Sequence, residues 1–194
     1  QFLEKLDIDY ARVTEGVQLI FYGLFKKLII ADRVGILVNT VYNHPDQHSG
    51  ATIGLATLFY SFQIYCDFSG YSDIAIGMGR VLGFKLIDNF KQPYLAASIS
   101  DFWKRWHISL SNWLRDYLFL PISYSLMRKI DRGKLNLKRA DKWAYVGSVL
   151  CTMLLCGLWH GANWTFVTWG LAHGVFMAVS FVTKKGRKKT TRFF

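Results

Sequence analysis

The chain has 194 residues, of which 52% are apolar, 16% aromatic and only 19% charged, so it is more apolar than an ordinary soluble domain. Its net charge of +11 is typical of nucleic-acid binders, but the basic residues gather in two short segments beside apolar runs. Segment 128–142 has seven basic and two acidic residues, and segment 184–192 has six basic residues. Cytosolic loops of membrane proteins have this composition, so the sequence indicates a polytopic membrane protein rather than a nucleic-acid binder.

The three cysteines, Cys66, Cys151 and Cys156, all lie in apolar stretches without CxxC spacing. This pattern predicts neither a disulfide framework nor a zinc site. We expect the three thiols to be small buried apolar groups.

The first third of the chain predicts one helix and a loop. Residues 1–15 are polar, and residues 17–38 have a helical pattern interrupted by four charges, which predicts a tilted or interfacial helix. Residues 43–50 are a loop by composition. His44 and His48 have the spacing of a zinc pair, but Pro45 opposes the helix that this geometry needs, so we expect no metal site.

Two apolar runs follow, 51–68 and 74–87, separated by a polar segment from Asp67 to Asp73. One interpretation is a broken helix or re-entrant turn, in which either acid orients a histidine or pairs with Arg80. The other is a turn at the membrane surface in which Asp73 caps the next helix.

Segment 93–121 predicts an interfacial amphipathic helix that starts near Ser98 and has an acid in its first turn. Its aromatic and apolar face is formed by Phe102, Trp106, Leu110, Trp113, Leu114 and Tyr117. On such a helix His107 lies about 100° from Trp106, so it either faces a cavity or is simply a polar-face residue. Asn112 lies on the polar side.

Two apolar runs near the end, 143–158 and 164–182, are about as long as membrane-spanning helices and flank His160. An imidazole near hydrocarbon is a functional candidate unless a partner explains it. Gly157 and Gly161 leave room beside it, and the Asn163 amide can orient the ring or a ligand. The alternative is an interfacial belt of Trp159, His160 and Trp164, in which the histidine merely faces lipid headgroups.

Three ordered segments together resemble one family: Tyr-Cys-Asp-Phe-Ser-Gly-Tyr-Ser-Asp at 65–73, Asp-Phe-Trp-Lys-Arg-Trp-His-Ile-Ser-Leu-Ser at 101–111, and Leu-Trp-His-Gly at 158–161. They are similar to the membrane-bound O-acyltransferases, in the bacterial branch that acetylates alginate and transfers D-alanine to teichoic acids. The resemblance extends from near Asp7 to at least Phe181. It implies that His160 is catalytic and that His107 is the second functional histidine.

The family fold is all-α, a ring of transmembrane, re-entrant and interfacial helices that encloses a channel. We therefore expect residues 1–194 to be a single partial domain that lacks helices of the full protein at both ends. The resemblance implies a multi-pass protein of the bacterial inner membrane and an acyl group, expected to be acetyl, that moves from a cytosolic thioester to a hydroxyl. The donor is acetyl-CoA or an acyl carrier protein, and the acceptor is an extracytoplasmic polysaccharide or a relay protein. We expect no metal and no tightly bound cofactor.

In this chemistry His160 is the general base, and His107, Asn163 or an indole N–H donates to the oxyanion. Further candidates for the substrate channel are Trp159, Asn163, Trp106, Asn112, Asp67 and Asp73. The basic loops either attract an anionic donor or act only as topology signals that contact anionic lipids.

Two other classes of protein compete with the acyltransferase. In an ion or proton transporter, Asp67, Asp73, His107 and His160 would form a relay, but the chain has no detectable internal repeat. A peripheral scaffold or nucleic-acid binder would expose the apolar runs around His160 to water.

Overall fold

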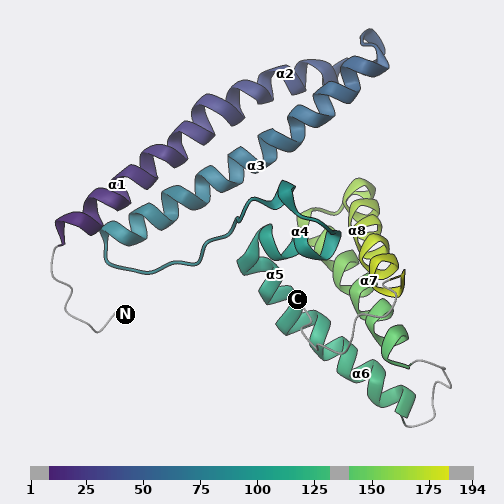
Figure 1. Ribbon diagram of the computed structural model, residues 1–194. Helices are drawn as coiled ribbons and strands as arrows, with labels where there is room; N and C mark the ends of the chain where they lie inside the picture. The colour runs from purple at the N-terminus through teal and green to yellow at the C-terminus, as the bar shows by residue number, and fades with distance from the viewer. Residues whose placement is uncertain (1–8, 132–139, 184–194) are drawn as a thin grey trace. The chain divides into compact units, whose positions relative to one another are not determined.

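The computed structural model describes residues 9–131 and 140–183, and every regular element within these ranges is a helix (Figure 1). The prediction of an all-α protein is confirmed for them. The chain divides into two compact units, residues 1–89 and 90–194.

The first unit is a helical hairpin (Figure 1). One arm contains α1 (Tyr10–Leu24), the π-helical segment η1 (Phe25–Ala31) and α2 (Asp32–Asn43). After the short 3-10 turn η2 (Pro45–Gln47), α3 (Gly50–Val81) forms the other arm. The predicted helix at 17–38 is confirmed. The four charged residues that interrupt its apolar pattern lie in the π-helical segment or directly after it.

Glycines bring the two arms into backbone contact. A Cβ atom on Gly77 would lie 2.5 Å from the carbonyl oxygen of Gly16, and one on Gly70 would lie 2.7 Å from that of Gly23. Gly16 and Gly23 are seven residues apart, as are Gly70 and Gly77, so each arm presents a small residue every second turn. The close approach of the arms therefore depends on hydrogen as the side chain at these positions.

This packing predicts that Gly77→Ala destabilises the protein by about 1–3 kcal/mol, because the new methyl group overlaps the Gly16 backbone. Gly54→Ala in the same helix is the matched control. No atom lies within 4 Å of a Cβ at Gly54, so alanine should there stabilise the helix by about 0.5–1 kcal/mol. Thermal unfolding of both purified variants in detergent should show a lower unfolding temperature for Gly77→Ala and a higher one for Gly54→Ala. Equal shifts of the unfolding temperature would contradict the close packing.

The expected break or turn between Asp67 and Asp73 is wrong. Residues 50–81 form one continuous helix, α3, in which Ser69, Gly70 and Ser72 are buried. Small residues commonly line the contact between packed helices in membranes. The same residue types are also common in turns, which explains the incorrect prediction.

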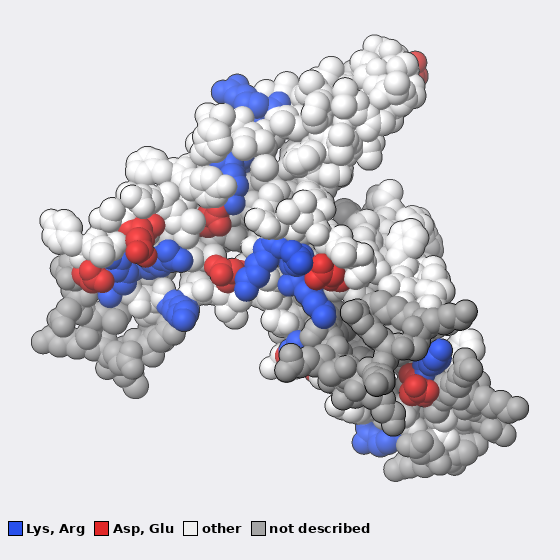
Figure 2. Space-filling view, in the orientation of Figure 1, with Lys and Arg blue, Asp and Glu red and all other residues white. Residues whose placement is uncertain are grey.

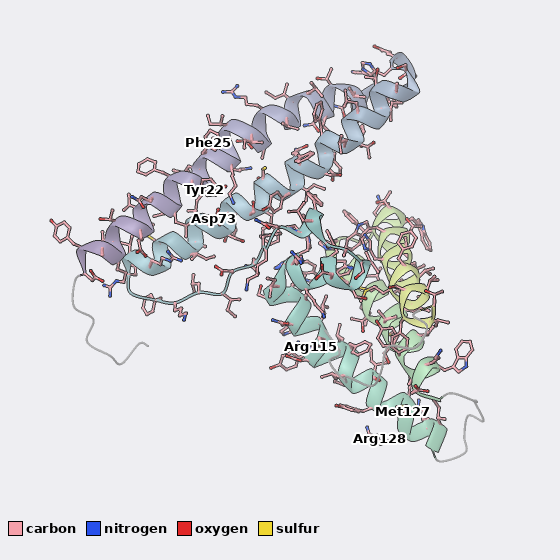
Figure 3. The ribbon with its side chains drawn as sticks, viewed as in Figure 1. Tyr22, Phe25, Asp73, Arg115, Met127 and Arg128 are labelled. Carbon is pink, nitrogen blue, oxygen red and sulfur yellow. The ribbon has the colours of Figure 1, made fainter. Side chains whose placement is uncertain are left out.

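In its described residues, 90–131 and 140–183, the second unit has six helical elements after the short turn η3 (Pro93–Leu95). They are α4 (Ile99–Arg105), α5 (Ile108–Leu114), the π-helical segment η4 (Arg115–Phe119), α6 (Leu120–Asp131), α7 (Ala140–His160) and α8 (Trp164–Thr183). The buried core side chains are Trp103, Phe119, Tyr145, Val149, Met153, Met177 and Ala178. Figure 3 labels Arg115 on η4, and Met127 and Arg128 on α6.

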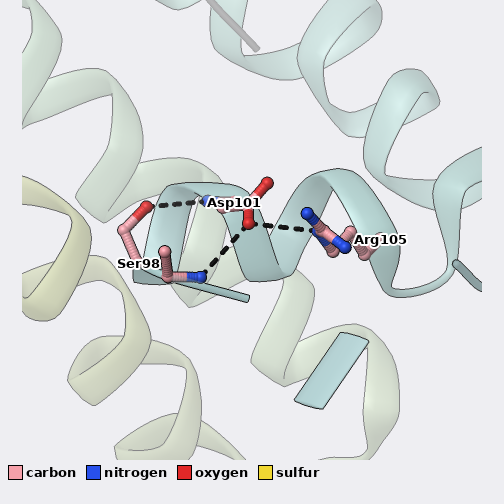
Figure 4. A network of polar contacts seen from close by, with 4 residues as sticks. Ser98, Asp101 and Arg105 are labelled. Atoms are coloured by element: carbon pink, nitrogen blue, oxygen red, sulfur yellow. Dashed lines mark hydrogen bonds and ion pairs between the residues drawn. The ribbon is translucent and has the colours of Figure 1, made fainter. Parts of the chain in front are cut away.

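The start of α4 agrees with the predicted start near Ser98. The Asp101 backbone N–H donates to Ser98 Oγ at 3.1 Å, and Asp101 Oδ2 accepts from the Ala97 N–H at 3.2 Å (Figure 4). Arg105 Nε also donates to Asp101 Oδ2, at 3.1 Å. This hydrogen bond from Arg105 lowers the pKa of the Asp101 carboxyl, so the acid stays ionised beside the positive end of the helix.

The prediction of one amphipathic helix from 98 to 117 is wrong, because the helix is broken at His107. Its backbone has φ 43°, in the left-handed region, and it separates α4 from α5. A non-glycine residue in this region is uncommon, and strain of this kind is worth about 1–3 kcal/mol. The Ser111 hydroxyl spans the break by donating to the Trp106 carbonyl oxygen at 3.0 Å.

Helices α7 and α8 pack closely, with Gly157 against the Phe166 backbone and Gly170 against the Met153 backbone. Residues 141–160 and 164–183 are long and apolar enough to cross a bilayer. The predicted pair of helices around His160 is confirmed. Residues 132–139 and 184–192, which carry most of the basic charge assigned to cytosolic loops, lie outside the described residues.

Much of the hairpin surface on the face shown in Figure 2 carries no Lys, Arg, Asp or Glu. Many large apolar side chains of the hairpin are exposed, among them Phe21, Ile36, Leu58 and Phe62. Exposed apolar area of this extent is characteristic of surfaces that contact lipid or protein.

Candidate active site

His160 is the last residue of α7, and its exposed imidazole is held by aromatic rings. The ring centroids of Trp159 and Trp169 lie 4.9 Å and 5.1 Å from it, and that of Phe166 lies 6.1 Å away. Trp169 and His160 are nearly perpendicular, at 84°, an arrangement that aromatic pairs favour. The first turns of α8 therefore orient one side of the ring, while another side stays accessible.

The turn that follows His160 is organised by Asn163. Its side-chain oxygen accepts hydrogen bonds from the Thr165 N–H at 3.0 Å and the Thr165 hydroxyl at 3.2 Å, so it caps α8. Gly161 leaves space for the Phe166 ring, because a Cβ atom there would lie 2.8 Å from it. The space that the sequence suggested for a substrate at Gly161 is thus filled by Phe166.

His107 is half-buried at the break between α4 and α5, in the same unit as His160. Burial lowers the pKa of His107, and the charge of the nearby His160 lowers it further. His107 is therefore neutral at pH 7 and can donate one hydrogen bond and accept another. The structure brings the two predicted histidines close enough to interact electrostatically.

Of the predicted channel residues in this unit, Trp106 is the most enclosed. It stacks on Phe102 at 5.5 Å with an interplanar angle of 16°, and contacts the Phe90 ring edge-on at 5.1 Å. Trp159 is 64% exposed, and Asn112 lies on the exposed side of α5. Trp106 thus belongs to the packing of α4, whereas Trp159 and Asn112 are accessible to a substrate.

A small cavity lies among α4, α5, η4, α7 and α8. It measures about 20 Å³ and is lined by Trp103, Ser111, Leu114, Arg115, Phe119, Val149, Thr152, Met153 and Met177. Within the described ranges, Trp103 Nε1 and Thr152 Oγ1 are buried without a hydrogen-bond partner. A cavity of this size has room for one water molecule, but not for an acyl substrate.

Asp67 and Asp73 belong to the first unit and form ion pairs with lysines. Asp73 pairs with Lys26, and Asp67 Oδ1 lies 2.5 Å from Lys27 Nζ. The expected pairing with Arg80 is wrong, because Arg80 lies 3.6 Å from Glu15 instead. Arg80 is two helical turns from Asp73 on the same helix, whereas the lysines approach from the opposite arm.

The site contains a third histidine that the sequence argument missed, His173 on α8. Its ring lies 4.7 Å from the Trp169 ring, which also contacts His160. Like His160, His173 is a lone imidazole beside or within an apolar run, and this pattern is the signal that could have found it. As for metals, no cluster of three or more His, Cys, Asp or Glu side chains is close enough to hold an ion in the part of the chain that the structure describes.

The fold and site define a helical protein with an accessible imidazole at the junction of two helices that are apolar enough to span a membrane. The sequence model of the MBOAT, membrane-bound O-acyltransferase family matches residues 9–193. The chain belongs to this family of membrane proteins, which confirms the resemblance found from three short segments.

Named relatives cover most of this chain. It is 42% identical over 168 residues to the probable alginate O-acetylase AlgI of Azotobacter vinelandii, covering 87% of this chain and 31% of that protein. It is 36% identical over 181 residues to the peptidoglycan O-acetyltransferase of Helicobacter pylori, covering 92% and 32%. It is 33% identical over 178 residues to the teichoic acid D-alanyltransferase of Bacillus subtilis, covering 90% and 42%. The chain therefore spans about a third of the length of the first two relatives.

Proposed function

We propose that the complete protein transfers an acyl group, acetyl in the first instance, from a thioester to a hydroxyl of an extracytoplasmic polysaccharide or relay protein. Family membership and the names of the relatives support acyl transfer. Acetyl is favoured because the two O-acetyl-transferring relatives above are 42% and 36% identical, against 33% for the D-alanyltransferase. The observation that carries the proposal is the accessible His160 imidazole, in the same unit as His107 and near enough to interact with it electrostatically.

In this mechanism His160 is the general base. A hydroxyl of the acceptor attacks the thioester carbonyl carbon, and its proton passes to the His160 imidazole. The tetrahedral intermediate then collapses, the C–S bond breaks, and the imidazolium returns the proton to the leaving thiolate. General-base catalysis of this kind contributes about 10²- to 10⁴-fold in rate.

His107 is the favoured donor to the oxyanion that forms on the carbonyl. Its lowered pKa keeps it neutral, so it does not repel the imidazolium that forms on His160. Asn163 is less suited to the task because its side-chain oxygen caps α8, which fixes the orientation of its amide. An indole N–H from Trp159 is the other candidate.

We propose an inner-membrane location, with acetyl-CoA or an acyl carrier protein arriving from the cytosol and the acceptor from outside. No tightly bound cofactor is needed, because the thioester is a co-substrate. The basic segments 128–142 and 184–192 are suited to attract an anionic donor, or act as topology signals beside anionic lipids.

The test is acyl transfer by the complete protein in proteoliposomes. Radiolabelled acetyl-CoA or acetylated carrier protein is supplied on one side and alginate or another acidic polysaccharide on the other, with empty liposomes as the control. The proposal predicts ester-linked label on the acceptor, released by mild base. If neither thioester donates label and Asp67-dependent ion flux appears instead, the protein is a transporter.

A further inference from the structure

His173 is a half-buried residue in the middle of α8, with three aromatic rings packed against it. The ring centroids of Trp169, Trp103 and Phe102 lie 4.7, 5.4 and 6.4 Å from that of His173. Helix α8 contains no Lys, Arg, Asp or Glu. The ring neighbours of this imidazole are therefore aromatic side chains, against which a phenylalanine could also pack.

Its Nδ1 atom is buried, and no hydrogen-bond partner for it is found among residues 9–131 and 140–183. Leaving a buried polar atom unpaired typically weakens folding by about 1–3 kcal/mol. A phenylalanine would fill the same aromatic cage without this penalty. A buried polar group that opposes stability in this way is typical of functional sites.

Trp169 connects His173 with the proposed base. It lies one helical turn before His173 on the same face of α8. Its ring also contacts that of His160, at 5.1 Å and 84°, and that of Trp103, at 6.0 Å. The indole is thus held between two imidazoles, and a shift of its ring would displace His160.

We propose that His173 is a positioning residue for acyl transfer, acting through Trp169 to hold the His160 ring in its reactive orientation. An imidazole N–H can point at the electron-rich face of an indole, a weak directional contact that phenylalanine cannot make. This inference rests on the proposed function, because it assumes that His160 carries the chemistry.

The decisive variant is His173→Phe in the complete protein, measured by acyl transfer and by thermal unfolding. We expect kcat to fall about 10- to 100-fold, since small misplacements of a reacting group have effects of this size. KM should stay unchanged, and the unfolding temperature should stay the same or rise. His173→Asn, which restores a polar atom, should recover part of kcat.

Two further variants sharpen the test. Phe176→Leu, at an exposed site on the same helix, is the control and should keep the wild-type rate. Trp169→Phe should lower kcat, and its combination with His173→Phe should lower kcat no further, because both act through one contact.

The results that would contradict the positioning role differ from those that would contradict the proposed function. If His173→Phe keeps the wild-type kcat, or loses activity only in proportion to lost folded protein, His173 has no positioning role. If the wild-type protein itself transfers no acyl group, the proposed function fails first.

Discussion

His160→Ala is expected to lower acyl transfer by the complete protein by about 10²- to 10⁴-fold while the protein stays folded. The large effect follows from the loss of the base that accepts the proton of the attacking hydroxyl. Folding should persist because the ring is exposed at the end of α7, where it lies against the rings of Trp159 and Trp169. Truncating it leaves no buried cavity.

Initial rates with a fixed thioester and acceptor check this expectation, with size-exclusion and thermal unfolding as measures of folding. His44→Ala is the matched control, because His44 is an exposed histidine between α2 and η2 in the other unit. If His160→Ala transferred acyl groups at the wild-type rate, His160 would not be the general base. Loss of activity in both variants would point to a defect of the preparation rather than of the site.

Lys26→Met is expected to destabilise the first unit by about 3–5 kcal/mol, because it leaves the Asp73 carboxylate without its charge partner between packed helices. Lys26 is only 8% exposed. Its ammonium group pairs with Asp73, donates to Ser69 Oγ at 3.2 Å, and lies 4.8 Å from the centre of the Tyr22 ring. Figure 3 shows Tyr22 on α1 and Asp73 on α3, on neighbouring stretches of the two arms.

The control is Arg80→Gln, which removes a longer and more exposed ion pair with Glu15. Exposed pairs of this kind contribute about 0–1 kcal/mol. The double variant Lys26→Met with Asp73→Leu should regain most of the lost stability, because it removes both charges of the pair together. Thermal or denaturant unfolding in detergent measures all three, and a Lys26→Met variant as stable as Arg80→Gln would show that the pair is unimportant.

The features that the sequence predicted correctly depend on neighbours close along the chain. Apolar runs of sufficient length around His160 predicted the pair α7 and α8, and Ser98 with Asp101 predicted the start of α4. Each follows from side-chain periodicity or from a hydrogen bond within one helical turn. Three short segments in order were enough to identify the family, because they concentrate rare residue types.

Only the tertiary structure decided which residues become partners and where the helices are interrupted. Asp73 pairs with Lys26, 47 positions away along the chain, because antiparallel arms in backbone contact bring them together. His107 breaks a helix that its neighbours would continue, and His173 joins the site through Trp169. The physical reason is that helical periodicity specifies which face a residue occupies, whereas its partner depends on which other face packs there.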